Sequence, residues 1–176
     1  MKVLEALSKH ISRRIKQSDP HGPVSLEVME YQLGIWLNTL CALLLTILLG
    51  WACGILPESI TALAAFYIVR RYSGGVHMRS LTACTIVSSL LFVLIPFVPM
   101  DKNMTLMVTG IAVVLFLLYS PNIFEERNPS AIDPYLKIIS CMLVAANFLI
   151  QSSEIAWSCA VQAILLLPLW KGGDSE

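Results

Sequence analysis

The feature that most constrains the fold is a series of six apolar segments separated by short polar stretches. They occupy residues 35–56, 60–69, 81–98, 104–119, 138–150 and 155–170. The first is long enough to cross about 30 Å of hydrocarbon as a helix, whereas 60–69 and 138–150 are short enough to lie at the interface or to re-enter. The sequence therefore predicts an all-α integral membrane protein with about six apolar helices.

The composition agrees with a chain that is surrounded by lipid. Hydrophobic residues make up 56% of the 176 residues and charged residues 14%, whereas soluble domains average about 45–50% apolar and roughly a quarter charged residues. The net charge is zero and no basic patch carries interleaved aromatic residues, so we expect no nucleic-acid partner. We predict a single membrane-embedded domain over residues 1–176.

The first part of the chain differs from the rest. Basic and apolar residues alternate up to Gln17, and Leu4, Leu7, Ile11 and Ile15 fall on one face of a helix. This pattern predicts an amphipathic helix at the membrane interface. We therefore expect residues 1–34 to be cytoplasmic or interfacial and residues 35–170 to form the transmembrane bundle.

The placement of charge predicts a topology. If all six segments cross and the amino terminus is cytoplasmic, eleven of the twelve basic residues lie inside and only Lys102 lies outside. Cytoplasmic loops of membrane proteins carry such an excess of lysine and arginine. We expect both termini at the cytoplasmic side, on the condition that 60–69 crosses.

One polar stretch, residues 70–84, gathers a histidine, a cysteine, three arginines and two glycines. A thiol becomes a nucleophile when a base or a positive charge favours its thiolate. Ser80 can cap a helix that begins near Leu81, which places Cys84 near the positive end of the helix dipole. Arg79 adds positive charge close by. We interpret the stretch as a membrane-embedded cysteine peptidase site with Cys84 as its nucleophile.

His77 is the candidate base for this cysteine. Seven residues along one straight helix separate two side chains by about 10 Å in height, which is beyond hydrogen-bond reach. The sequence therefore predicts a break at Gly74-Gly75 and a loop or half-helix that folds His77 back over the thiol. An interfacial histidine that bonds to backbone or water remains an equal alternative.

The other polar residues of the stretch have two open roles each. Arg70, Arg71 and Arg79 either anchor helix ends at the headgroups or bind carboxylates of a substrate. Gly74 and Gly75 either form only a turn or let a substrate backbone approach the nucleophile.

The remaining cysteines and motifs favour no other chemistry. Four cysteines lie inside apolar runs and are expected to be small apolar side chains: Cys41, Cys53, Cys141 and Cys159. The chain has no His-Glu-x-x-His motif and no Gly-x-Ser-x-Gly motif, so we expect neither a metal nor a cofactor. A transporter or peptide exporter without a covalent step is the main alternative. It would place polar residues near the bilayer midplane, whereas here they gather at one face.

The block Arg-Tyr-Ser-Gly-Gly-Val-His over residues 71–77, followed by Cys84, resembles the accessory gene regulator B family of bacterial quorum-sensing peptidases. Glu30, Tyr31, Gly34 and Pro121 are consistent with that family. The resemblance implies a homodimer in the bacterial cell membrane, with its active site at the cytoplasmic face.

The same resemblance implies a reaction. The cysteine, here Cys84, cleaves a small propeptide with an acidic carboxyl-terminal tail and keeps the core as a thioester. An internal cysteine or serine of the peptide then closes a thiolactone or lactone ring. His77 would be the general base and acid. Arg70 or Arg71 would align with the family's arginine, and Gly75 with its glycine. The sequence identifies neither the propeptide nor a third residue that orients His77.

Overall fold

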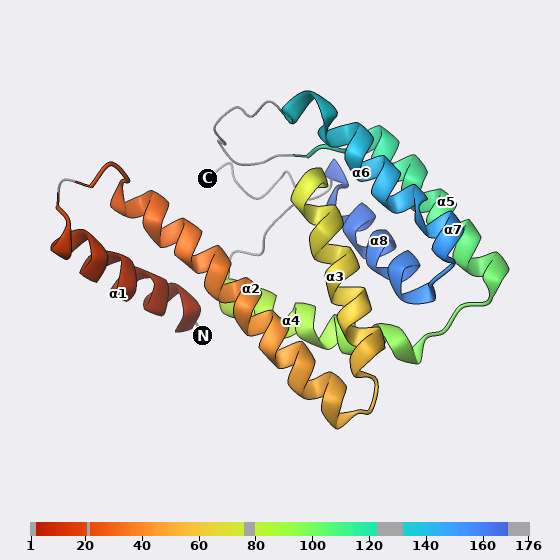
Figure 1. The fold of residues 1–176 in the computed structure, drawn as a ribbon, viewed down its shortest axis with the longest axis horizontal. Helices are drawn as coiled ribbons and strands as arrows, with labels where there is room; N and C mark the ends of the chain where they lie inside the picture. The colour runs from red at the N-terminus through yellow and green to blue at the C-terminus, as the bar shows by residue number, and fades with distance from the viewer. Residues whose placement is uncertain (1–2, 21, 76–79, 123–131, 169–176) are drawn as a thin grey trace.

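In the computed structural model the chain forms a bundle of helices, described for residues 3–20, 22–75, 80–122 and 132–168. Figure 1 shows the bundle, with α1 and the first part of α2 extending away from the other helices. The helices are α1 (Val3–Ser18), α2 (Leu26–Ala52), α3 (Leu56–Ser73), α4 (Leu81–Leu94), α5 (Lys102–Tyr119), α6 (Leu136–Ala145), α7 (Asn147–Ile150) and α8 (Ser153–Leu165), with 3-10 turns η1 (Ile95–Phe97) and η2 (Asp133–Tyr135). The prediction of an all-α membrane protein is confirmed.

The described part of each predicted apolar segment lies mostly in helix. Among the described residues, three stretches are long and apolar enough to cross a membrane: α2, α5 and the run from Asp133 to Ile150. The segment 138–150 is therefore part of a longer helical stretch than the sequence pattern indicated. Leu81–Phe97 is a shorter apolar helix, and 60–69 lies within the 18-residue α3.

The first long helix begins nine residues before the apolar segment that predicted it. Ser25 caps α2, because its hydroxyl accepts a hydrogen bond from the Val28 N–H at 3.3 Å. The helix ends at Ala52, and Gly54 follows with a φ of +72°. The polar first turns of α2 are helical because this cap satisfies backbone donors at the helix start.

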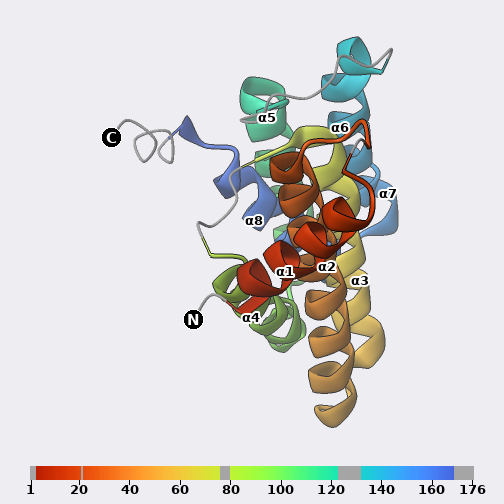
Figure 2. The same ribbon diagram turned by 90° about the vertical axis from the view of Figure 1, so that its left-hand side faces the viewer.

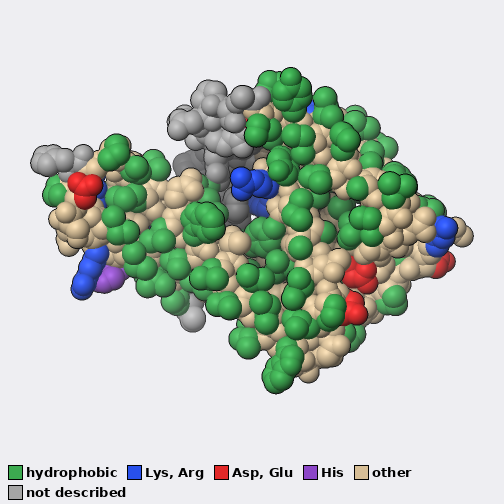
Figure 3. Space-filling view, viewed as in Figure 1, with side chains coloured by type: hydrophobic (Ala, Val, Ile, Leu, Met, Phe, Trp, Pro, Cys, Tyr) green, Lys and Arg blue, Asp and Glu red, His purple; other side chains and the backbone are tan. Residues whose placement is uncertain are grey.

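The long helix α2 has two contrasting faces. Large side chains on one face are exposed, including Trp36, Leu40, Leu44, Leu48 and Trp51. The buried residues recur every fourth position and are all small or polar: Gly34, Asn38, Ala42, Thr46 and Gly50. Small residues let helix backbones approach closely inside a membrane. The buried face of α2 packs against α1, α3 and α4. On the molecule as a whole, apolar side chains cover much of the surface that Figure 3 shows.

The predicted amphipathic helix is present at the amino terminus, but the set of residues that it buries differs from the predicted one. Leu4, Ser8 and Ser12 are buried, because α1 packs closely against α2. Leu7 and Ile15, predicted on the same face as Leu4, remain exposed. Figure 2 views the molecule from the side of α1. The small serines allow the close packing, and part of the apolar stripe stays on the surface.

Two apolar clusters hold the rest of the bundle together. Phe66 and Phe92 are the centre of one, with ring centroids 5.2 Å apart, and join α3 to α4. Phe116, Val144 and Leu166 belong to the other, which joins α5, α6 and the end of α8. These clusters fix α3 and α4 relative to each other, and those helices carry the described part of the predicted site.

Candidate active site

The helix that carries the candidate nucleophile begins where the sequence predicted. Ser80 caps α4, and its hydroxyl accepts a hydrogen bond from the Ala83 N–H at 3.4 Å. Cys84 follows in the first turn, where its own N–H donates to the Ser80 carbonyl at 2.9 Å. Its side chain is half-buried. Both the cap and the position of the thiol are as predicted.

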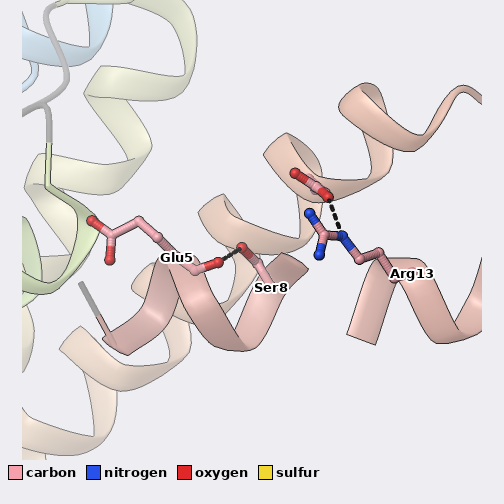
Figure 4. A network of polar contacts seen from close by, with 4 residues as sticks. Glu5, Ser8 and Arg13 are labelled. Carbon is pink, nitrogen blue, oxygen red and sulfur yellow. Dashed lines mark hydrogen bonds and ion pairs between the residues drawn. The ribbon is translucent and has the colours of Figure 1, made fainter. Parts of the chain in front are cut away.

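A carboxylate from the first helix completes this cap. Glu5 on α1 accepts hydrogen bonds from the Leu81 N–H at 2.8 Å and from the Thr82 hydroxyl at 3.2 Å. Figure 4 shows Glu5 directed toward the neighbouring helix, and farther along α1 the ion pair of Arg13 with Glu30 at 3.6 Å. Partial burial acts to raise the pKa of Glu5, but the hydrogen bonds outweigh it and lower the pKa below 4.5. The amino-terminal helix is thereby tied to the helix of Cys84.

A buried amide lies beside the Cys84 sulfur. Asn38 on α2 directs its Nδ2 toward Cys84 Sγ at 4.0 Å. The Thr85 hydroxyl donates to Asn38 Oδ1 at 2.7 Å and so fixes which end of the amide faces the thiol. Ser88, one turn farther along α4, places its hydroxyl 3.9 Å from the same sulfur. The thiol thus lies in a polar cluster between α2 and α4.

The predicted glycine break ends α3. Gly74 and Gly75 have φ angles of +71° and +121°, which residues with a Cβ rarely adopt. The Gly75 N–H donates to the Asn122 carbonyl at 2.9 Å, and Asn122 N–H donates to the Ser73 carbonyl at 2.8 Å. Gln162 on α8 donates to the Gly74 carbonyl at 2.6 Å and to the Ser73 hydroxyl at 2.9 Å. The turn is therefore held by two other parts of the chain.

Space as well as backbone angle requires glycine here. A Cβ at Gly75 would lie 3.1 Å from Gln162 Nε2 and 3.5 Å from Arg70 Nη1. Gln162 is fully buried and engaged in several hydrogen bonds, so it has little freedom to move. Both glycine N–H groups are also engaged, since that of Gly74 donates to the Arg70 carbonyl at 3.0 Å.

Arg70 connects this turn to the thiol. Its guanidinium donates to Gln162 Oε1 at 3.3 Å and to the Gly75 carbonyl at 3.5 Å, and it lies 5.6 Å from the Phe66 ring centroid. Its charge also lies within electrostatic range of Cys84. One arginine on α3 thus contacts the glycine turn and lies within electrostatic range of the candidate nucleophile.

The structure brings together only some of the predicted residues. Arg70 is hydrogen-bonded to the Gly74-Gly75 turn and lies within electrostatic range of Cys84, whereas Arg71 on α3 is exposed. His77 and Arg79 lie outside the described residues, so the predicted fold of the imidazole over the thiol stays a prediction. Within the described ranges, no group of three or more His, Cys, Asp or Glu side chains is arranged to hold a metal ion.

Two residues near the predicted site were missed in the sequence. Asn38 and Gln162 are both almost fully buried, although each lies within an apolar run. An amide inside an apolar membrane segment is itself a signal, because such groups bond across helices. That signal identifies the residue but not its partner. Asn38 and Cys84 are 46 positions apart in the sequence, and Gln162 and Arg70 are 92 positions apart.

Comparison with known protein families shows which family the chain belongs to. The model of the family described as accessory gene regulator B matches residues 5–170. The chain belongs to the accessory gene regulator B family. The family is one of membrane proteins linked to quorum-sensing gene regulation, and the sequence resemblance is confirmed.

Several known proteins are similar to the chain. FsrB of Enterococcus faecalis is 25% identical over 81% of this chain and 64% of its own length. An AgrB-like protein of Halalkalibacterium halodurans is 24% identical over 95% of this chain and 88% of its own length. The accessory gene regulator protein B of Staphylococcus carnosus is 30% identical over 53% of this chain and 51% of its own length. No solved structure matches the chain.

Proposed function

We propose that the protein is a membrane-embedded cysteine endopeptidase that processes a signalling propeptide for quorum sensing. The observation that carries the proposal is the surroundings of Cys84. This thiol occupies the first turn of α4, with the Asn38 amide at 4.0 Å and the Arg70 guanidinium of α3 within electrostatic range. A cation beside a thiol stabilises the nucleophilic thiolate. Membership of the accessory gene regulator B family supports the same reaction.

The first step forms an acyl-enzyme. The Cys84 thiolate attacks the scissile carbonyl carbon of the propeptide and forms a C–S bond. The C–N bond then breaks, and the amine of the carboxyl-terminal tail leaves with a proton from His77, which acts as general acid. Arg70 stabilises the thiolate, and the exposed Arg71 pairs with carboxylates of the acidic tail.

The second step releases the peptide as a ring. An internal thiol or hydroxyl of the bound peptide gives up its proton to His77 and attacks the thioester carbonyl. The new bond closes a thiolactone or lactone, and the Cys84 thiolate is regenerated. Exchange of an amide for a thioester is energetically uphill, so removal of the tail or of the cyclic product draws the reaction forward.

A water-poor site favours cyclisation over hydrolysis. Tyr31 and Trp51 are both exposed on α2, and they stand about 30 Å apart along the helix, at 1.5 Å rise per residue. Tyrosine and tryptophan often mark the two membrane interfaces. On that scale Asn38 lies about 10 Å inward from the level of Tyr31. A thioester at that depth is protected from bulk water until the internal nucleophile arrives.

The proposal includes the setting of the enzyme. Both termini and the entrance to the site face the cytoplasm, where the basic residues gather by the positive-inside rule. The enzyme works as a homodimer in the bacterial cell membrane, on a propeptide made in the cytoplasm.

The test measures tail release from the presumed propeptide by the protein in lipid vesicles. We expect release by the native chain and by Cys41→Ala, since Cys41 is a half-buried thiol of α2. Cys84→Ala abolishes release, and His77→Ala reduces it strongly. Cleavage by Cys84→Ala would contradict the cysteine mechanism. Transport of intact propeptide by the native chain, without cleavage, would instead support a transporter.

A further inference from the structure

The polar cluster around Cys84 leaves one question of chemistry open: what stabilises the charge that develops on the carbonyl oxygen during acyl transfer. When a thiolate attacks a carbonyl, an electron pair of the C=O bond moves to the oxygen. Hydrogen-bond donors placed near this oxyanion are usually the largest single contribution to such catalysis. In a membrane site poor in water, the protein itself must provide the donor.

Most backbone donors close to Cys84 and at the glycine turn are already engaged. The Cys84 N–H donates to the Ser80 carbonyl at 2.9 Å, and the Ala83 N–H donates to the Ser80 hydroxyl at 3.4 Å. The Leu81 N–H donates to Glu5 at 2.8 Å. The Gly75 N–H is engaged by the Asn122 carbonyl at 2.9 Å. These four N–H groups are not free to serve the oxyanion, and a side-chain donor beside the sulfur is the stronger candidate.

Asn38 has the required donor in the required place. Its side chain is 4% exposed, and its Oδ1 is occupied by the Thr85 hydroxyl at 2.7 Å. Its Nδ2 carries two N–H groups. Among the described residues, the acceptor that Nδ2 faces is Cys84 Sγ at 4.0 Å. Sulfur is a weak acceptor. The amide is thus held in one orientation with donor capacity that the resting state uses poorly.

The distance of 4.0 Å between Asn38 Nδ2 and Cys84 Sγ is long for a hydrogen bond to the thiol but leaves room for one to an oxyanion. In the tetrahedral intermediate the oxyanion is bonded to the carbon that the sulfur has just attacked, so it lies within a few ångströms of that sulfur. An oxygen to one side of the line from Cys84 Sγ to Asn38 Nδ2, two bonds from the sulfur, can reach the roughly 2.7–3.1 Å from Nδ2 that an oxyanion donor requires. The bond would then be strong in the transition state and weak before it, which is the condition for catalysis.

We propose that Asn38 is a catalytic residue, whose side-chain amide donates a hydrogen bond to the oxyanion formed when Cys84 is acylated. This inference rests on the proposed nucleophilic role of Cys84. Thr85 is a positioning residue, since it acts by holding the Asn38 amide with Nδ2 toward the sulfur. Ser88, whose hydroxyl is 3.9 Å from the sulfur, is the competing donor.

Two small reagents separate this role from a structural one without the natural propeptide. With p-nitrophenyl acetate, the thiolate attacks the ester carbonyl, an oxyanion forms, and p-nitrophenolate leaves as an acetyl thioester is made. With iodoacetamide, the thiolate displaces iodide from a saturated carbon and no oxyanion forms. Both rates at Cys84 are measured against pH on the full chain in vesicles, by mass spectrometry of the peptide that contains it.

The variants are Asn38→Leu, which has a similar size and no donor, and Thr46→Val as the matched control. Thr46 is buried two turns farther along the same face of α2, and its hydroxyl has no hydrogen-bond partner among the described residues. We expect Asn38→Leu to slow acetylation of Cys84 roughly 10- to 100-fold, since removal of one oxyanion donor costs natural reactions about 100- to 1,000-fold. Its alkylation stays at the native rate, and Thr46→Val changes neither.

Other outcomes overturn the inference. If Asn38→Leu slows acetylation and alkylation equally, Asn38 acts on the thiolate or on the fold. If acetylation is unchanged, or falls only with Ser88→Ala, Asn38 is not the donor. A different result would contradict the proposed function itself. If p-nitrophenyl acetate acetylates Cys84 of the native chain no faster than the exposed Cys53, Cys84 is not an activated nucleophile.

Discussion

Two buried asparagines of this protein differ in how fully their hydrogen bonds are used. Asn147, on α7, is fully buried and donates to the Thr109 hydroxyl at 2.9 Å and to the Ser152 carbonyl at 3.1 Å. Its Oδ1 accepts from the Ser152 N–H at 3.1 Å. Asn38 is buried as deeply, but its amide nitrogen faces only a thiol sulfur within the described part of the chain.

The difference separates a structural amide from a functional one. Buried polar groups are normally satisfied, because an unmade hydrogen bond away from water is costly. Asn147 follows that rule and joins α5, α7 and the start of α8. Asn38 departs from it beside the candidate nucleophile, where an unused donor can serve a charge that exists only during the reaction.

The largest expected effect is on propeptide cleavage. Asn38→Leu lowers the rate of tail release roughly 100- to 1,000-fold, as expected for loss of an oxyanion donor. Asn147→Leu, assayed below its unfolding temperature, retains the native rate because its bonds lie away from Cys84. Single-turnover assays in vesicles measure both. Equal losses in the two variants would remove the distinction between the asparagines.

We expect the free energy of unfolding to rank the two variants in the opposite order, with the larger loss in Asn147→Leu. Asn147→Leu leaves both the N–H and the carbonyl of Ser152 without that partner and lowers the free energy of unfolding by about 2–3 kcal/mol. Asn38→Leu costs about 1 kcal/mol or less, because the Thr85 hydroxyl proton can then be donated wholly to the Leu81 carbonyl, 3.1 Å away. Unfolding by denaturing detergent in mixed micelles measures both values. A larger loss for Asn38→Leu would make it a structural residue.

A smaller effect tests the glycine turn beside the site. Gly75→Ala places a Cβ 3.1 Å from Gln162 Nε2 at a φ of +121° and should slow tail release about tenfold, a cost of about 1.4 kcal/mol in the transition state. Gly54→Ala is the matched control, because its φ is +72° and open space surrounds its Cβ position. It should strain the backbone less, because +72° is close to the left-handed helical region, and leave tail release unchanged. A loss of activity in both variants would show that backbone strain alone is responsible.

The smallest expected effect concerns pH. The pKa of Glu5 is lowered in the folded state, so its contribution to stability is present above pH 4.5 and is lost as pH falls through the lower, folded pKa. Below pH 4.5 the contact between α1 and α4 should therefore loosen. Hydrogen exchange of residues 80–84, corrected for intrinsic rates, measures this loosening.

Two variants isolate that effect. Glu5→Gln removes the acid-induced loosening, whereas Glu27→Gln, which changes an exposed acid on α2, leaves it as in the native chain. The same loosening in Glu5→Gln would mean that another group is responsible.

The sequence predicted the parts of the fold that depend on local chemistry. Ser80 capped the helix as expected, because a serine hydroxyl bonds backbone donors two or three residues ahead. Gly74 and Gly75 ended α3 as expected. The start of α2 was missed, since the pattern of apolar residues begins at Ile35 whereas the helix begins at the Ser25 cap.

The candidate site was predicted only along one stretch of chain. Cys84 and Arg70 could be found because they lie together in a polar segment of an apolar sequence. Asn38, Gln162 and Asn122 come from distant segments, and their roles depend on how the helices pack. A single sequence carries the periodicity of each helix but not which faces meet.

The most direct test of the account is the intact mass of the native protein after brief incubation with its propeptide in vesicles. We predict an increase by the mass of the peptide without its tail, located on Cys84 and removed by neutral hydroxylamine, which cleaves thioesters. The adduct should be absent from Cys84→Ala and present on Cys41→Ala. Tail release with no such adduct, or an adduct on another residue, would contradict an acyl-enzyme at Cys84.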